Sequence, residues 1–162
     1  MSPQAERRPL PDSETLMSHL RPLVGSSGHD GVTLVTRQVN DRESHYASEV
    51  VTCGWPEGRT LRLLVKYGDG EDTMACGLSV GPAYEALVYT QVLPRFGVTV
   101  PHCYGIWRDP GEGIAVLALE YLDGVEGHRA PDRIEGMALA AGWIGHLHAR
   151  GELPVTEGTL PA

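Results

Sequence analysis

The residue with the clearest chemical meaning in this sequence is a lysine. Lys66 is the only lysine among 162 residues, whereas arginine occurs twelve times. A lysine ammonium is a compact point charge and a guanidinium is a planar fork, so a single lysine in an arginine-rich chain can mark a place that needs a compact cation. Chance explains one lysine equally well, and its neighbours must decide between the two interpretations.

Glu85 is the second candidate, because it lies at the start of a helix pattern. Gly81-Pro82 suits the beginning of a helix, since proline is favoured at the first helical position, and a helix is expected over Ala83–Leu93 with Pro94 ending it. Glu85 then falls in the first turn, where the helix dipole favours a carboxylate. A carboxylate that aims a cation and a merely solvated glutamate both fit this position.

Strand patterns surround this helix in the sequence. Three precede it and are joined by short connections, which is typical of an antiparallel meander: Val32–Val39, Tyr46–Trp55 and Thr60–Tyr67. Two follow it, His102–Arg108 and Ile114–Leu122, and the second is apolar enough to lie inside a sheet.

The third strand decides where the lysine points. Successive side chains of a strand alternate between the two faces of a sheet. Leu61, Leu63 and Val65 therefore share one face, and Arg62, Leu64 and Lys66 share the other. Lys66 is expected at the end of its strand, on the less apolar face.

Two helices are expected near the ends of the chain. Ser13 can cap the first, which has apolar residues at helical spacing up to Val24. Asp132 and Glu135 form a capping-box pair for the second, which runs to about Arg150 and is ended by Gly151. The predicted organisation is a flexible tail (1–12), a main domain (13–122), a hinge or linker (123–131), a long helix (132–150) and a tail (151–162).

Composition narrows the function classes. The formal charge of −8 disfavours binding to nucleic acid or to an anionic membrane surface. The sequence contains no apolar run of membrane-spanning length and no secretory signal pattern. Three cysteines without C-x-x-C spacing predict neither a disulfide framework nor a zinc site, so a cytoplasmic location is expected.

Five stretches, in this order, resemble the small lobe of the aminoglycoside phosphotransferase/choline kinase family, whose members are relatives of protein kinases. Leu63-Leu-Val-Lys66 resembles the lysine motif of the third strand, and Tyr84-Glu-Ala-Leu-Val-Tyr-Thr-Gln-Val-Leu-Pro94 resembles the glutamate-bearing helix. Val100-Pro-His-Cys-Tyr-Gly105 and Leu117-Ala-Leu-Glu-Tyr-Leu-Asp-Gly124 resemble the fourth strand and the fifth strand with the hinge. Trp143-Ile-Gly-His-Leu-His-Ala149 resembles the helix before the catalytic loop.

The resemblance covers about residues 13–150 and implies an α+β fold. The family's small lobe is a five-stranded antiparallel sheet with a glutamate-bearing helix, here followed by a linker and one long helix of the second lobe. It also implies ATP as the cofactor. Lys66 and Glu85 would form the ion pair that positions the ATP phosphates. Ser48, in the phrase Tyr46-Ala-Ser48, would touch a phosphate through its hydroxyl, although strand surface is an equally good interpretation.

The base of the nucleotide would lie at the hinge. The family uses main-chain groups there, which correspond to the carbonyl of Glu120 and the N–H of Leu122, so the Glu120 side chain need not take part. Leu119 would border the base as an apolar gate. Val50 and Ala118 would line the same pocket.

Two departures from the family pattern bear on activity. The loop Asn40–Ser48 has no glycine, so its amides cannot approach phosphates as a glycine-rich loop allows. In the family a His-Gly-Asp-type loop, an asparagine and a metal-binding aspartate follow the long helix, whereas residues 151–162 contain neither aspartate nor asparagine. The catalytic base and the Mg²⁺ ligands are therefore expected to be missing, and this chain alone is expected to be inactive.

Three interpretations stay open. In the first, the chain is the ATP-binding lobe of a small-molecule phosphotransferase whose second lobe lies elsewhere. In the second, it is a stand-alone, pseudokinase-like module that binds a nucleotide or a partner without catalysis. The apolar stripe of the helix at 132–150 would be covered by the missing lobe in the first interpretation, and by a homodimer partner or the helix at 13–24 in the second. In the third, it is an unrelated α+β protein whose Lys66 and Glu85 are surface residues.

Overall fold

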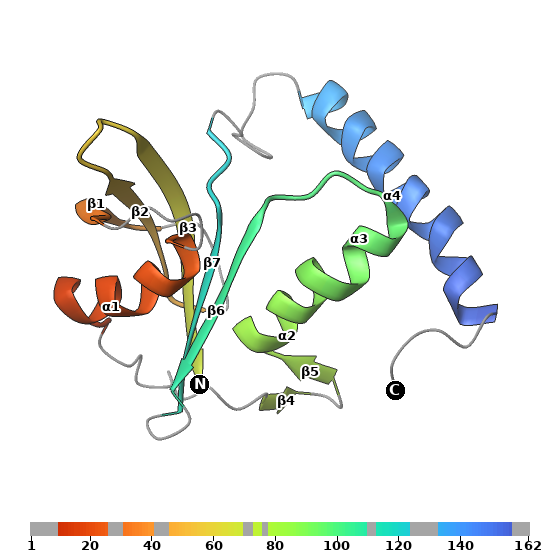
Figure 1. Ribbon diagram of the computed structural model, residues 1–162. Coiled ribbons are helices and arrows are strands. Elements are labelled where there is room, and N and C mark those ends of the chain that lie inside the picture. Colours follow the sequence, from red (N-terminus) through yellow and green to blue (C-terminus); the bar gives the residue numbers. More distant parts are fainter. Residues whose placement is uncertain are drawn as a thin grey trace, which may run out of the picture. The chain divides into compact units, whose positions relative to one another are not determined.

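Figure 1 shows the fold in a computed structural model of the chain. The structure describes residues 10–25, 31–40, 46–69, 73–75, 78–109, 113–123 and 133–156. Several predicted segments lie wholly or partly outside these ranges: the tail 1–12, the loop Asn40–Ser48, the linker 123–131, the capping pair at Asp132 and the tail 151–162. No helix among the described residues combines the length and the apolar character needed to cross a membrane.

A five-stranded antiparallel sheet is the central element. Its strands are β1 (Thr33–Val39), β2 (Ser48–Gly54), β3 (Thr60–Asp69), β6 (Cys103–Asp109) and β7 (Ile114–Glu120), in the order β1-β2-β3-β7-β6. The turn between β2 and β3 contains Gly58 at a φ of 86°, a conformation that L side chains rarely adopt. The predicted α+β fold with a five-stranded antiparallel sheet is confirmed, and β7 lies inside the sheet, as predicted.

The region after Lys66 differs from the prediction. β3 continues to Asp69, which pairs with Ile114 of β7, so Lys66 lies within the strand and not at its end. Long-range pairing with β7 extends the strand, and no local pattern reports such pairing. A small ribbon of β4 (Thr73–Ala75) and β5 (Leu78–Val80) was not predicted either, because three residues are too few for an alternating pattern.

One face of the sheet packs against α1 (Ser13–Val24), and Figure 1 shows α1 and α2 on opposite sides of the sheet. Apolar residues of α1 and of the strands make the buried core on the α1 side: Leu16, Met17, Leu20, Val51, Leu63, Val65 and Val116. The cap of α1 is Asp12 and not Ser13, because the Asp12 carboxylate accepts the Thr15 N–H at 2.8 Å. Ser13 is the first residue inside the helix.

The second helical stretch changes its winding. α2 (Pro82–Leu87) is followed by a π-helix, η1 (Val88–Val92), and by α3 (Leu93–Phe96). The prediction that Pro94 ends the helix is therefore wrong. Pro94 is one of the first two residues of α3, where its missing N–H is tolerated. The stretch ends at Gly97, which is left-handed with a φ of 58°.

The last helix, α4 (Arg133–Thr156), is longer than predicted, because it continues past Gly151. A glycine inside a helix costs only about 1 kcal/mol relative to alanine, so a glycine alone does not have to end it.

By its contacts the chain forms two compact units, residues 1–88 with 101–121 and residues 89–100 with 122–162. Within the second unit, α4 is bonded to the segment around the end of α3. Trp143 Nε1 donates to the carbonyl of Thr99 at 2.8 Å, and Arg150 Nη1 donates to the carbonyl of Phe96 at 2.6 Å.

Candidate functional site

Lys66 and Glu85 form an ion pair in the first unit. The Lys66 Nζ donates to Glu85 Oε1 at 2.7 Å, and the two side chains are 20% and 26% exposed. A charge-assisted hydrogen bond of this length orients the ammonium. An ammonium has three N–H donors, so a second, anionic ligand can be bound while the bond to Glu85 persists.

β3 places Lys66 on the middle strand of the sheet, opposite Ser48 of β2 and Leu117 of β7. Side chains directly opposite one another on antiparallel strands share a face. Lys66, Ser48 and Leu117 therefore form one row across the sheet, which we call the lysine row. Two residues earlier along β3 lies a second row, the apolar row, which consists of Val50, Leu64 and Leu119.

α2 brings Glu85 to this face of the sheet. The helix packs against β3, β6 and β7, and its buried residues are Pro82, Ala83 and Ala86. The Glu85 N–H donates to the carbonyl of Gly81 at 2.9 Å, so Glu85 lies in the first helical turn, as predicted. Short buried side chains let a helix approach a sheet closely, which suits the short reach of a glutamate.

Ser48 is buried, with 4% of its surface exposed, so it is not strand surface. Its Oγ accepts a hydrogen bond from Asn40 Nδ2 at 3.0 Å, and the Asn40 backbone N–H donates to the Ser48 carbonyl at 2.9 Å. A hydroxyl that accepts from Asn40 retains its own proton for donation. Asn40 was missed in the sequence, where it counted only as the start of a glycine-free loop.

Glu120 and Leu119 stand at the end of β7. The Glu120 carboxylate accepts the backbone N–H of His102 at 2.9 Å, and the Glu120 N–H donates to the His102 carbonyl at 2.7 Å. The carboxylate is thus bonded to the segment that leads into β6. Leu119 is 2% exposed and pairs with Cys103 of β6. Leu122 belongs to the second unit and its side chain is exposed.

Cys103 pairs with Leu119 and lies on the face of the sheet that carries Lys66, which we call the lysine face; it was not singled out from the sequence. Burial raises the pKa of its thiol, and the charge of the nearby Glu85 carboxylate adds to the rise. A cysteine in a strand carries no sequence signal of its own, so only the sheet pairing identifies it.

Of the two predicted pocket residues, Val50 lies on the lysine face and Ala118 does not. Ala118 pairs with Val65 and belongs to the buried core that packs against α1. The prediction for Ala118 is therefore wrong, and Leu117 is the β7 residue opposite Lys66. The reason is the alternation of a strand, since a shift of one residue reverses the face.

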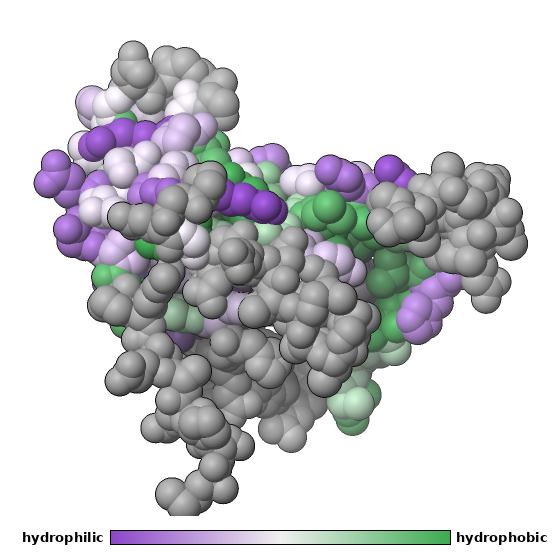
Figure 2. Space-filling view, turned by 90° about the horizontal axis from the view of Figure 1, so that it is seen from below, coloured by the Kyte–Doolittle hydropathy of each residue, from purple (hydrophilic) through white to green (hydrophobic). Residues whose placement is uncertain are grey.

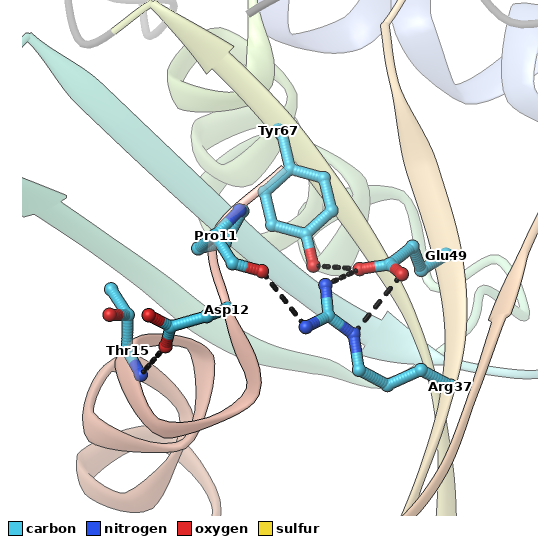
Figure 3. Close-up of polar contacts among 6 residues, drawn as sticks. All are labelled: Pro11, Asp12, Thr15, Arg37, Glu49 and Tyr67. Carbon is cyan, nitrogen blue, oxygen red and sulfur yellow. Dashed lines mark hydrogen bonds and ion pairs between the residues drawn. The ribbon is translucent and has the colours of Figure 1, made fainter. Parts of the chain in front are cut away.

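A second charged cluster, not predicted, lies on the α1 face (Figure 3). Arg37 Nη2 and Nε donate to the two Glu49 carboxylate oxygens at 2.5 and 3.1 Å, and Arg37 Nη1 donates to the carbonyl of Pro11 at 2.9 Å. The Tyr67 hydroxyl donates to Glu49 Oε2 at 2.5 Å. Burial, strengthened by the Glu49 carboxylate, raises the pKa of Tyr67.

The described residues offer no metal site, because no three histidine, cysteine, aspartate or glutamate side chains among them are grouped closely enough to hold a metal ion. The chemistry available at the lysine row is electrostatic: an oriented ammonium and a buried hydroxyl that can both donate to an anion.

Compared with protein families, curated proteins and solved structures, the chain shows no significant match to any of them.

Proposed function

We propose that this chain is the ATP-binding lobe of a small-molecule phosphotransferase with a protein-kinase-like fold, of the aminoglycoside phosphotransferase/choline kinase type. The observation that carries the proposal is the 2.7 Å bond between Lys66 and Glu85. In kinases a strand lysine, paired with a helical glutamate, neutralises the phosphates of ATP, and both must be in place.

The surroundings of the pair support the phosphate end of the proposal. Ser48 lies directly opposite Lys66 and its hydroxyl can donate to the same anion. A triphosphate carries several negative charges, and a cation held beside a hydroxyl in a partly buried site binds it better than a cation free in water. Lys66 and Ser48 are the residues that we expect to touch the phosphates.

The apolar row supports the base end. Two residues along a strand span about 6.6 Å, so Val50, Leu64 and Leu119 lie about one base width from the lysine row. Branched aliphatic side chains without polar groups provide an apolar surface against which an adenine can pack. The main-chain carbonyl of Glu120 would bind its edge, and the Glu120 carboxylate, which is bonded to His102, would take no part.

A second candidate function is a stand-alone partner-binding module without catalysis. Large apolar side chains of α4 are exposed, namely Ile134, Met137, Leu139 and Ile144, with Ile134 at 83%. Figure 2 draws apolar residues in green, and green surface is exposed on the right-hand side of the view. A second lobe or a second copy of the chain would cover this surface.

The proposal is tested by the unfolding temperature with and without ATP. At an ATP concentration 100 times the Kd we expect a gain of about 2.7 kcal/mol, or roughly 5–10 °C. Lys66→Met should abolish the gain, because it removes the ammonium. Arg21→Met removes the same charge from the exposed last turn of α1 and should leave the gain intact.

Two results would contradict the nucleotide role. One is the absence of any gain in the unmutated chain at millimolar ATP, with or without magnesium. The other is an equal gain in the unmutated chain and in Lys66→Met.

A further inference from the structure

Gly68 and Pro82 lie against each other beside the ion pair. A β-carbon built on Gly68 would lie 2.5 Å from Pro82 Cδ and 2.6 Å from Pro82 Cγ, so the proline ring rests directly on the glycine backbone. The next neighbour is Tyr46 Cδ1, at an ordinary contact distance of 3.5 Å. The distances to Pro82 are too short for a side chain at position 68 unless Pro82 moves.

This contact and the ion pair join the same two elements. Gly68 follows Lys66 by two residues in β3, so both lie on one face of the sheet. Pro82 precedes Glu85 by three residues, about one helical turn, in α2. The start of α2 is therefore fixed to β3 at two points, Pro82 on Gly68 and Glu85 on Lys66.

The contact of Pro82 with Gly68 sets the length of the Lys66–Glu85 hydrogen bond. A hydrogen bond weakens steeply when donor and acceptor separate beyond about 3.5 Å, and the Lys66–Glu85 bond is 2.7 Å long. A methyl group at Gly68 would have to push the Pro82 ring away by about 1 Å to reach normal contact. Because Pro82 is the first residue of α2, that displacement would carry Glu85 away from Lys66.

Glycine is needed at position 68 for this approach and not for its backbone angle. Gly68 does not have a positive φ, and it lies within regular β3 pairing, opposite Ala115. A glycine inside a strand often marks a place where another segment comes close. Alanine would suit the backbone here, so the effect of a substitution reports the contact with Pro82.

We propose that Gly68 and Pro82 are positioning residues: the proline ring seated on bare backbone sets the distance at which Glu85 holds the Lys66 ammonium. The consequence for ATP rests on the proposed function, whereas the effect on the ion pair does not. Neither residue touches the nucleotide in this account.

The test uses the fact that Lys66 is the only lysine, so an ¹⁵N-labelled chain gives a single lysine ammonium signal in a ¹H–¹⁵N spectrum. Without nucleotide, Glu85→Gln should shift this signal away from its position in the unmutated chain, because the bond to the carboxylate is lost. In Gly68→Ala the signal should already have the shifted position, and adding Glu85→Gln should change it no further.

Rescue separates positioning from general damage. Pro82→Ala removes Cγ and Cδ, so the double variant Gly68→Ala/Pro82→Ala should recover the signal of the unmutated chain. Gly142→Ala, which adds the same methyl group on α4 where nothing lies within 4 Å, should leave the signal unchanged. If Gly68→Ala does not fold, the double variant still decides, because a folded double variant without the paired signal overturns the proposal.

An unshifted signal in folded Gly68→Ala also overturns it. Nucleotide binding is then measured separately, and Gly68→Ala should weaken ATP binding roughly tenfold or more. Loss of the paired signal with unchanged ATP affinity would uphold the positioning and contradict the proposed role of the pair. Failure of the unmutated chain to bind ATP would contradict the proposed function alone.

Discussion

Glu49 and Glu85 bind their cations on opposite faces of the sheet and in different surroundings. Glu49 is 4% exposed and accepts bonds from both Arg37 and Tyr67, so both of its oxygens are bonded inside the protein. The Glu85 side chain is 26% exposed and receives one bond from Lys66. A buried cluster whose members bond one another fixes structure, whereas the partly exposed Lys66–Glu85 pair retains N–H donors for a ligand. This contrast is why we assign function to Lys66 and not to Arg37.

The Glu49 cluster gives a prediction about alkaline pH. Burial and the Glu49 carboxylate raise the pKa of Tyr67 in the folded chain, whereas an unfolded tyrosine titrates at about 10. Above that pH the unfolded chain releases a proton that the folded chain keeps. The stabilisation by Tyr67 is therefore complete below about pH 10 and is lost as the pH rises further.

Urea unfolding of the unmutated chain and of Tyr67→Phe measures this effect. At neutral pH the variant should be less stable by about 1.5–3 kcal/mol, because it loses a hydrogen bond to a charged group. The difference between the two proteins should shrink as the pH rises above about 10. A difference that stays constant with pH would show that the Tyr67 proton is not held by Glu49.

At the scale of elements, local patterns predicted well wherever a signal repeats along the chain. The alternation in Thr60–Tyr67 predicted the face of Lys66, and the proline after Gly81 predicted where α2 begins. Local patterns failed where contact with a segment distant in the sequence determines the structure. Pairing with β7 lengthens β3, and no neighbour in sequence reports that Pro82 rests on Gly68. The error at Ala118 arose because a shift of one residue along a strand places a side chain on the opposite face of the sheet.

The bonds of α4 give a prediction for one element. Trp143 Nε1 donates to the Thr99 carbonyl, so Trp143→Phe keeps an aromatic ring and removes the donor. The loss of one such bond costs about 1 kcal/mol, which corresponds to roughly fivefold faster local opening. Hydrogen exchange of α4 amides should show this increase. Ile144→Ala, a change at an exposed neighbour, should not, and equal exchange in all three proteins would refute the role of the Trp143 bond.

At the scale of the whole molecule, the exposed apolar surface of α4 is the feature expected to drive association. Ile134 and Met137 are 83% and 70% exposed, which favours association with another protein surface. We expect the chain to self-associate with increasing concentration in sedimentation experiments. Met137→Glu should reduce this association, while Val39→Glu, at an equally exposed apolar residue of β1, should not. A chain that is monomeric at every concentration would contradict this expectation.

The central claim, that Lys66 lies at the phosphates of a bound nucleotide, can be tested on the amine itself. An acyl phosphate of ATP carries an acyl group at the end of the phosphate chain. A lysine amine next to that group attacks the acyl carbon, forms an amide and releases ATP. Because the chain has one lysine, the modified site is found directly by mass spectrometry, and the α-amino group serves as an internal measure of unspecific labelling.

We predict that Lys66 is acylated faster than the α-amino group, that free ATP suppresses its labelling and that Glu85→Gln slows it. Labelling of Lys66 at a rate that ATP does not change, or no labelling beyond that of the α-amino group, would contradict a nucleotide site at this lysine.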